Sequence, residues 1–101
     1  MRLSQNFWLN ELTKSSTADR MGIINEPGIE EIVNLTVLTQ HVLQPVREKF
    51  GVISVNSGYR SPELNTKVGG SKTSQHCFGQ AADFEQMGTP NAEVATWISN
   101  E

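Results

Sequence analysis

The longest regular spacing of hydrophobic positions lies between residues 29 and 50. At about 100° per residue, the apolar side chains of this stretch fall on one arc of roughly 140°. They are Ile32, Leu35, Leu38, Val42, Leu43, Val46 and Phe50. Pro45 falls inside the pattern, where it removes one backbone donor and crowds a carbonyl one turn earlier. Because Val46 and Phe50 keep the phase, the spacing predicts a single helix that is kinked at Pro45 and ends at Gly51.

Two shorter stretches have the character of strands. Residues 52–57 are rich in β-branched side chains and partly alternate, which predicts a strand that ends at Gly58. Residues 80–84 predict a second strand, with Phe84 facing the core. Between them, Pro62 begins a predicted short helix. The expected fold is therefore α+β, with a small antiparallel sheet and the long kinked helix packed on one face.

The two ends of the chain have weaker patterns. Residues 6–12 predict a short helix or turn, and we expect Trp8 and Trp97 to lie in the core. Thr89 begins a last predicted helix, which continues to Glu101 without a C-cap. We therefore expect residues 1–101 to form a single domain that is truncated at its C-terminus.

Composition excludes several classes of protein. The net charge is -3 and no basic patch occurs, which argues against a nucleic-acid binder. No apolar run approaches the roughly 18 residues of a membrane span. The single cysteine, Cys77, excludes a disulfide within the chain. The N-terminus lacks the pattern of a signal peptide, so we expect synthesis in the cytoplasm.

The polar stretch from Ser71 to Phe84 contains a pair of candidate metal ligands. His76 and Asp83 flank Gly79, and a turn at Gly79 would let the two side chains converge. A neutral imidazole and a carboxylate both suit zinc, at about 2.0–2.2 Å each. A histidine and aspartate pair is, however, more often a surface hydrogen bond, and spacing alone leaves both interpretations open.

Two motifs resemble those of the zinc D-alanyl-D-alanine carboxypeptidase family, which includes vancomycin-resistance dipeptidases and phage endolysin peptidases. Residues 74–83, SQHCFGQAAD, match its S-x-H-x-x-G-x-A-x-D motif at every fixed position. Residues 57–62, SGYRSP, followed by Asn65, are similar to its second signature. The N-terminal part, from Leu3 to Ala18, is similar to the phage-associated branch. The resemblance implies a fold like that of DD-peptidases and Hedgehog domains.

The resemblance also implies roles for individual residues. His76 and Asp83 would be zinc ligands, Arg60 would stabilise negative charge on the substrate, and Ser74 and Tyr59 would bind substrate. The implied reaction is hydrolysis of a peptide bond in peptidoglycan stem peptides, of carboxypeptidase or endolysin type. Such a protein of a phage would be made in the host cytoplasm and act at the cell wall after export or lysis.

Alternatives remain for residues around the motifs. Arg60 could pair with Glu63 on the surface, and Asn65 is expected to be a structural turn or capping residue. His41 is expected to be an exposed helix histidine. Cys77 is expected to point away from His76, as adjacent residues of an extended chain do.

The family's third zinc ligand is a histidine in a C-terminal strand, preceded by a glutamate base. This chain ends at Glu101, before that segment. Besides a peptidase, we therefore consider a non-catalytic module that binds wall peptides or a partner, and a split enzyme completed by a second chain.

Overall fold

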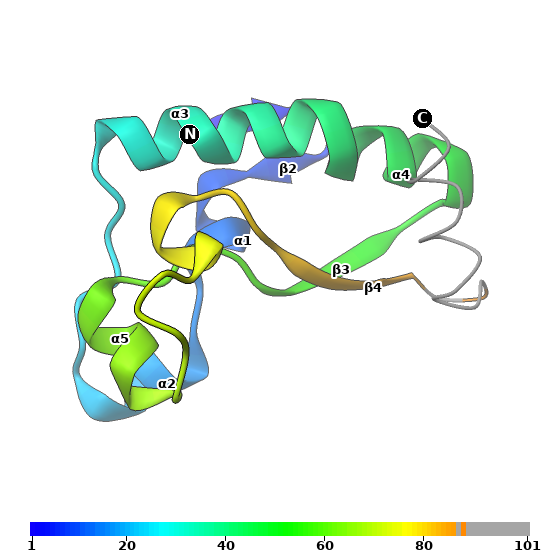
Figure 1. Ribbon diagram of the computed structural model, residues 1–101. Coiled ribbons are helices and arrows are strands. Elements are labelled where there is room, and N and C mark those ends of the chain that lie inside the picture. Colours follow the sequence, from blue (N-terminus) through cyan, green and yellow to red (C-terminus); the bar gives the residue numbers. More distant parts are fainter. Residues whose placement is uncertain (87, 89–101) are drawn as a thin grey trace.

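The computed structural model describes residues 1–86 and 88, which adopt an α+β fold (Figure 1). The strands are β1 (Arg2–Ser4), β2 (Phe7–Trp8), β3 (Ile53–Ser57) and β4 (Asp83–Gln86). The helices are α1 (Leu9–Thr13), α2 (Ser16–Met21), α3 (Ile29–Leu38), α4 (Gln44–Phe50) and α5 (Pro62–Lys67). A π-helical turn, η1 (Thr39–Leu43), joins α3 to α4, and a 3-10 turn, η2 (Gln75–Phe78), precedes β4. The predicted fold class is confirmed.

The long helix is present over its predicted length, but its irregularity lies before Pro45 rather than at it. The amide of Gln44 donates to the carbonyl of Thr39, five residues earlier, so one turn is widened. Pro45 then occupies the first turn of α4, where a missing N–H is tolerated. Gly51 ends the helix with a φ of 96°, as predicted. No helix in the described part of the chain is long and apolar enough to cross a membrane.

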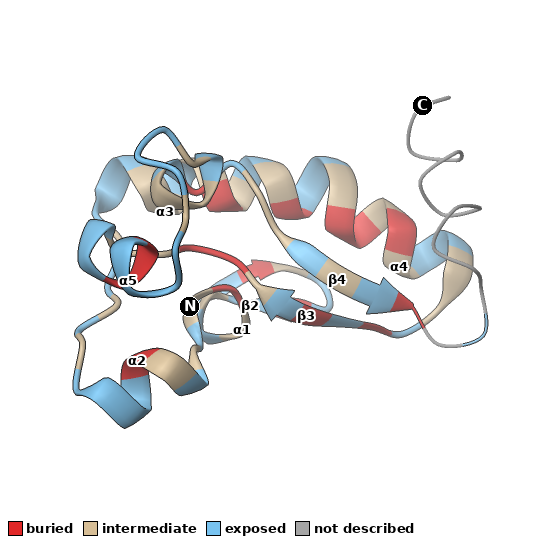
Figure 2. Cartoon of the chain, turned by 60° about the horizontal axis from the view of Figure 1, so that its bottom comes forward, coloured by how far each residue is buried: buried red, intermediate tan, exposed pale blue. Residues whose placement is uncertain are grey.

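The core lies between this helix and the β3–β4 sheet. Leu35, Leu43 and Val46 from the predicted apolar arc are buried against Ile53 and Val55 of β3. Figure 2 shows the buried parts of α3 and α4 on the side of the helix that faces the strands. Alternate residues of β3 are exposed, which is the pattern of a sheet with one solvated face. The helix therefore supports one face of the sheet and leaves the other accessible.

The N-terminal segment differs from its prediction. It forms a two-stranded antiparallel ribbon, β1–β2, before the short helix α1. Successive residues of a strand point to opposite faces, so Phe7 is buried while Trp8 is 50% exposed. Trp8 packs against the guanidinium of Arg2 instead, at 6.0 Å from the ring centroid. The expectation that Trp8 lies in the core was wrong.

The second strand starts later than predicted. β4 begins at Asp83 and pairs antiparallel with β3, Val55 lying opposite Phe84. The register shifts by one residue at Asn56, so that Ser57 rather than Asn56 lies opposite Asp83. Phe84 packs against the core as expected. The predicted helix from Thr89, with Trp97, lies outside the described residues.

Candidate metal centre

The turn that carries His76 is short and tightly fixed. Ser74 caps η2, because its hydroxyl accepts the amide N–H of His76 at 3.3 Å. Gly79 ends the turn with a φ of 73°, a conformation that favours glycine. A Cβ at Gly79 would also lie 2.5 Å from the carbonyl oxygen of Glu31 on α3. The predicted turn at Gly79 is thus present, and it redirects the chain from η2 toward β4.

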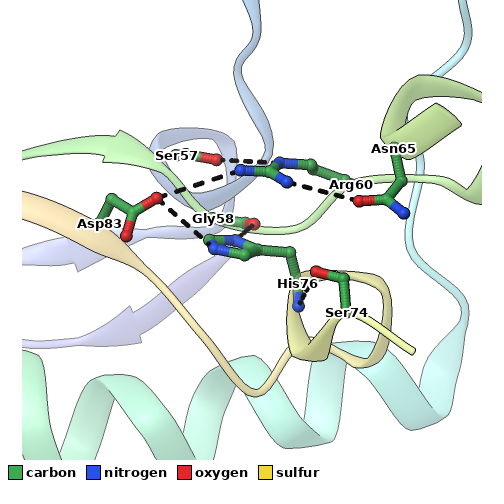
Figure 3. A network of polar contacts seen from close by, with 7 residues as sticks. All are labelled: Ser57, Gly58, Arg60, Asn65, Ser74, His76 and Asp83. Atoms are coloured by element: carbon green, nitrogen blue, oxygen red, sulfur yellow. Dashed lines mark hydrogen bonds and ion pairs between the residues drawn. The ribbon is translucent and has the colours of Figure 1, made fainter. Parts of the chain in front are cut away.

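The imidazole of His76 is oriented by a backbone carbonyl. Nδ1 lies 2.7 Å from the carbonyl oxygen of Gly58 (Figure 3). Since a carbonyl oxygen accepts and does not donate, Nδ1 carries a proton, and in the neutral imidazole Nε2 then has a free lone pair. Metal-binding histidines are held in this way by a partner on the other ring nitrogen. The structure therefore leaves Nε2 of His76 as the donor for a metal.

Nε2 of His76 faces the carboxylate of Asp83, with Oδ2 at 3.5 Å. Two donors of a tetrahedral zinc ion at about 2.0–2.1 Å are separated by about 3.3–3.4 Å. The observed separation thus matches the edge of a zinc coordination tetrahedron. The imidazole is 13% exposed and the carboxylate 64% exposed, so this pair lies open to the solvated face of the sheet.

Arg60 lies beside this pair rather than on the outer surface. Its Nη2 is 4.0 Å from Oδ2 of Asp83, and its Nε donates to the hydroxyl of Ser57 at 3.4 Å. Nη1 donates to Oδ1 of Asn65 at 3.4 Å (Figure 3). The alternative in which Arg60 pairs with Glu63 is not what the structure shows. One positive charge therefore lies against the oxygen that would face a metal.

Asn65 has the structural role that was expected, and it also contacts Arg60. It is buried in α5, and its Nδ2 donates to the carbonyl of Ser71 at 2.7 Å. Gly70 makes room for it, because a Cβ there would overlap the amide of Asn65. The loop before η2 is thus tied to the residue that holds the guanidinium.

Tyr59 and Ser74, the residues predicted to bind substrate, have structural contacts in the free protein. Tyr59 is 7% exposed and belongs to the core cluster. Burial raises the pKa of its hydroxyl above the ordinary value of 10.0, and Glu31 and Cys77 add to this effect. Its side chain lines a cavity of about 180 Å³ beside Arg60 and another of about 300 Å³ beside Cys77. The substrate-binding roles of Tyr59 and Ser74 stay predictions.

His41 and Cys77 do not join the pair. His41 is exposed on η1, as expected. Cys77 is half-buried. It lies in a 3-10 turn, so the expectation that it and His76 belong to extended chain was wrong. Within residues 1–86 and 88, no group of three His, Cys, Asp or Glu side chains could hold one metal ion. The described residues therefore provide two metal donors.

Comparison with known proteins identifies the family. The sequence model of the family described as Peptidase M15 matches residues 5–101. The chain belongs to the Peptidase M15 family. A zinc D-Ala-D-Ala carboxypeptidase from Streptomyces albus G is 43% identical to this M15 chain over 50 residues. That match covers 48% of the chain and 20% of the relative, and no solved structure gives a significant match.

The family predicted from the two motifs is thus confirmed, while the phage-associated branch stays a prediction. The motifs indicated His76, Asp83 and Arg60 but not their partners. The carbonyl of Gly58 contacts His76 across 18 positions of sequence, and backbone groups carry no signal of their own in a sequence.

Proposed function

We propose that this M15 chain carries the metal-binding part of a zinc peptidase that cleaves peptidoglycan stem peptides at a D-amino acid. The observation that carries the proposal is the 3.5 Å separation of Nε2 of His76 and Oδ2 of Asp83, which suits one zinc ion. The similarity to a protein named zinc D-Ala-D-Ala carboxypeptidase supports the choice of metal and substrate.

In this proposal each residue of the site has a separate chemical role. A zinc ion held by His76 and Asp83 would polarise the scissile carbonyl and lower the pKa of a bound water. Arg60 would stabilise negative charge that develops on the substrate oxygen, because its guanidinium lies at the edge of the site. Ser74 and Tyr59 would line the path of the substrate next to these groups.

Two parts of the reaction need residues beyond those described. A catalytic zinc site uses three protein ligands and keeps one position open. Residues 1–86 and 88 supply two, so the third ligand and a general base must come from elsewhere in the protein or from a second chain. The same shortage of donors favours a second candidate function, a module that binds wall peptides without cleaving them.

The proposal extends to the biological setting. An endolysin of a phage is the finer assignment, and the similarity of the N-terminal residues to the phage-associated branch supports it. Such a protein would be made in the cytoplasm and reach the cell wall after export or lysis. The alternative is another zinc peptidase of the cell wall, a D-Ala-D-Ala carboxypeptidase. The peptide products of the reaction distinguish an endolysin from such a carboxypeptidase.

The test compares the 101-residue polypeptide with a longer version that adds a C-terminal segment bearing a glutamate and, a few residues on, a histidine. Release of D-alanine or of cleaved stem peptide is measured with added zinc and with a chelator. We expect the longer protein to be faster by at least about 10²–10⁴-fold, the usual contribution of a general acid or base. Chelator-sensitive turnover by the short chain at an equal rate would show that its own residues complete the site. Peptide binding without turnover in both would favour the binding module.

A further inference from the structure

Asn25, which lies outside both motifs, makes an unusually complete set of hydrogen bonds. It belongs to the segment between α2 and α3 and is half-buried. Its Nδ2 donates to the carbonyl of Thr13 at 2.8 Å and to the carbonyl of Tyr59 at 3.0 Å. Its Oδ1 accepts the amide N–H of Ser61 at 2.7 Å. The carbonyl of Tyr59 and the amide of Ser61 belong to the residues directly before and after Arg60.

Several backbone groups around Arg60 are held by hydrogen bonds. The amide of Tyr59 donates to the carbonyl of Leu12 at 2.7 Å, and the amide of Arg60 donates to the carbonyl of His76 at 3.1 Å. Asn25 holds two further groups, the carbonyl of Tyr59 and the amide of Ser61. Its side chain thus bonds to the backbone on both sides of Arg60.

The side chain of Arg60, in contrast, is held by long contacts. Its two hydrogen bonds measure 3.4 Å each and its distance to Asp83 is 4.0 Å. Contacts of this length constrain a flexible side chain weakly. The direction in which the guanidinium leaves the backbone must therefore be set mainly by the backbone itself, and Asn25 is the side chain that fixes it.

We propose that Asn25 is a positioning residue for Arg60. The amide holds the Tyr59–Ser61 backbone so that the guanidinium reaches Ser57 and Asp83, and it ties this segment to the end of α1 through Thr13. What Arg60 does for a substrate rests on the proposed function, whereas the dependence of its position on Asn25 does not. A displacement of about 1 Å in a catalytic group can cost roughly 10²-fold in rate.

Two substitutions separate the bonds of Asn25. Asn25→Asp keeps an acceptor for the amide of Ser61 but directs a negative charge at the carbonyls of Thr13 and Tyr59. Asn25→Ala removes all three bonds. Asn10→Asp is the matched control, because Asn10 is exposed on α1 and its side chain makes no hydrogen bond within the described residues.

The primary measurement is the NMR signal of the Arg60 side-chain Nε–H group, assigned by its loss in Arg60→Lys. We expect this signal to shift or broaden in Asn25→Asp and Asn25→Ala, and to stay in place in Asn10→Asp. In the complete, active protein we also expect kcat to fall by about 10²-fold in both Asn25 variants with a smaller change in KM.

An unchanged Nε–H signal in a folded Asn25 variant would overturn the proposal. So would a failure of both variants to fold under conditions in which Asn10→Asp is folded, since Asn25 would then be a residue of the scaffold as a whole. If the longer protein with its glutamate and histidine cleaves no wall peptide but the signal still moves, the proposed function fails and the positioning role of Asn25 stands.

Discussion

His76 and Asp83 meet from very different surroundings. The imidazole is largely buried and fixed by the carbonyl of Gly58, whereas the carboxylate is largely exposed at the start of β4. Contacts of so exposed a carboxylate contribute little to stability. Asp83 therefore matters for metal binding far more than for folding, and its removal should be a clean test.

Asp83→Ala should lower zinc affinity by more than about 100-fold, because loss of a mere supporting partner of a ligand already costs 10–100-fold. Cys77 follows His76 in the sequence and lines a cavity with Tyr59, and neither His76 nor Asp83 lines that cavity. Cys77→Ala should therefore leave the affinity almost unchanged. Calorimetric titration with zinc measures both. Equal losses in the two variants would contradict the assignment, because the thiol would then contribute as much to metal binding as the carboxylate.

Tyr59 offers a spectroscopic test of burial at the site. It is the single tyrosine of the chain, so tyrosinate absorbance reports this side chain alone. Its pKa is raised by burial first and then by Glu31 and Cys77, so the midpoint should lie above 10.0 in the folded protein. Ionisation at or below pH 10.0 in the native state would contradict the buried position.

The same shift predicts how stability depends on pH. Because the folded protein holds the Tyr59 proton more tightly than the unfolded chain, its contribution to stability is intact below pH 10 and is lost as pH rises toward the folded pKa. Tyr59→Phe should show a shallower decline above pH 10 in urea unfolding than the wild type. Parallel declines would place the cause in other groups.

At the level of the helix, the widened turn η1 contains a buried polar atom without a partner. The hydroxyl of Thr39 is fully buried and makes no hydrogen bond within the described residues. An unpaired buried hydroxyl costs about 1–3 kcal/mol. Thr39→Val keeps the shape of the side chain and should raise the free energy of unfolding by about 1 kcal/mol.

Thr36→Val is the matched control one turn earlier. The hydroxyl of Thr36 donates to the carbonyl of Ile32 at 2.8 Å, so its loss should be neutral or destabilising. Denaturant unfolding measures the free energy of unfolding of both variants. A loss of stability in Thr39→Val would show that its hydroxyl has a partner in solution.

At the scale of the whole molecule, Gly58 lies where three elements meet. A Cβ there would overlap the carbonyl of Leu12 at the end of α1, and the Gly58 carbonyl orients His76 in η2. Gly58→Ala should therefore lower the free energy of unfolding by about 1–3 kcal/mol, as overpacking does. It should also weaken zinc binding, because a shift of the backbone at residue 58 would displace the carbonyl that orients the imidazole.

Gly28→Ala provides the comparison for that substitution. A Cβ at Gly28 would meet mainly the carboxylate of Glu31, a flexible side chain, and its φ of -78° suits any residue. We expect a loss of less than about 1 kcal/mol, from the N-cap position alone. Thermal unfolding and zinc titration that rank Gly28→Ala as the more harmful variant would refute the role of Gly58.

Several features of this protein were determined by short stretches of sequence. The helix from residue 29 to 50, its end at Gly51 and the start of α5 at Pro62 follow from local spacing and from the backbone limits of glycine and proline. The metal-donor pair was likewise visible, because His76, Gly79 and Asp83 lie in one motif. These predictions needed only neighbouring residues.

Tertiary structure alone decided which groups meet around that pair. The protonated nitrogen of His76 is set by Gly58, and the guanidinium of Arg60 is directed to Asp83 through a backbone that Asn25 holds from 34 and 36 positions away. The exposure of Trp8 was decided in the same way, by the pairing of β2 with β1. Such contacts join residues that are distant in the chain, and several involve backbone atoms that are alike in every residue, so no local pattern encodes them.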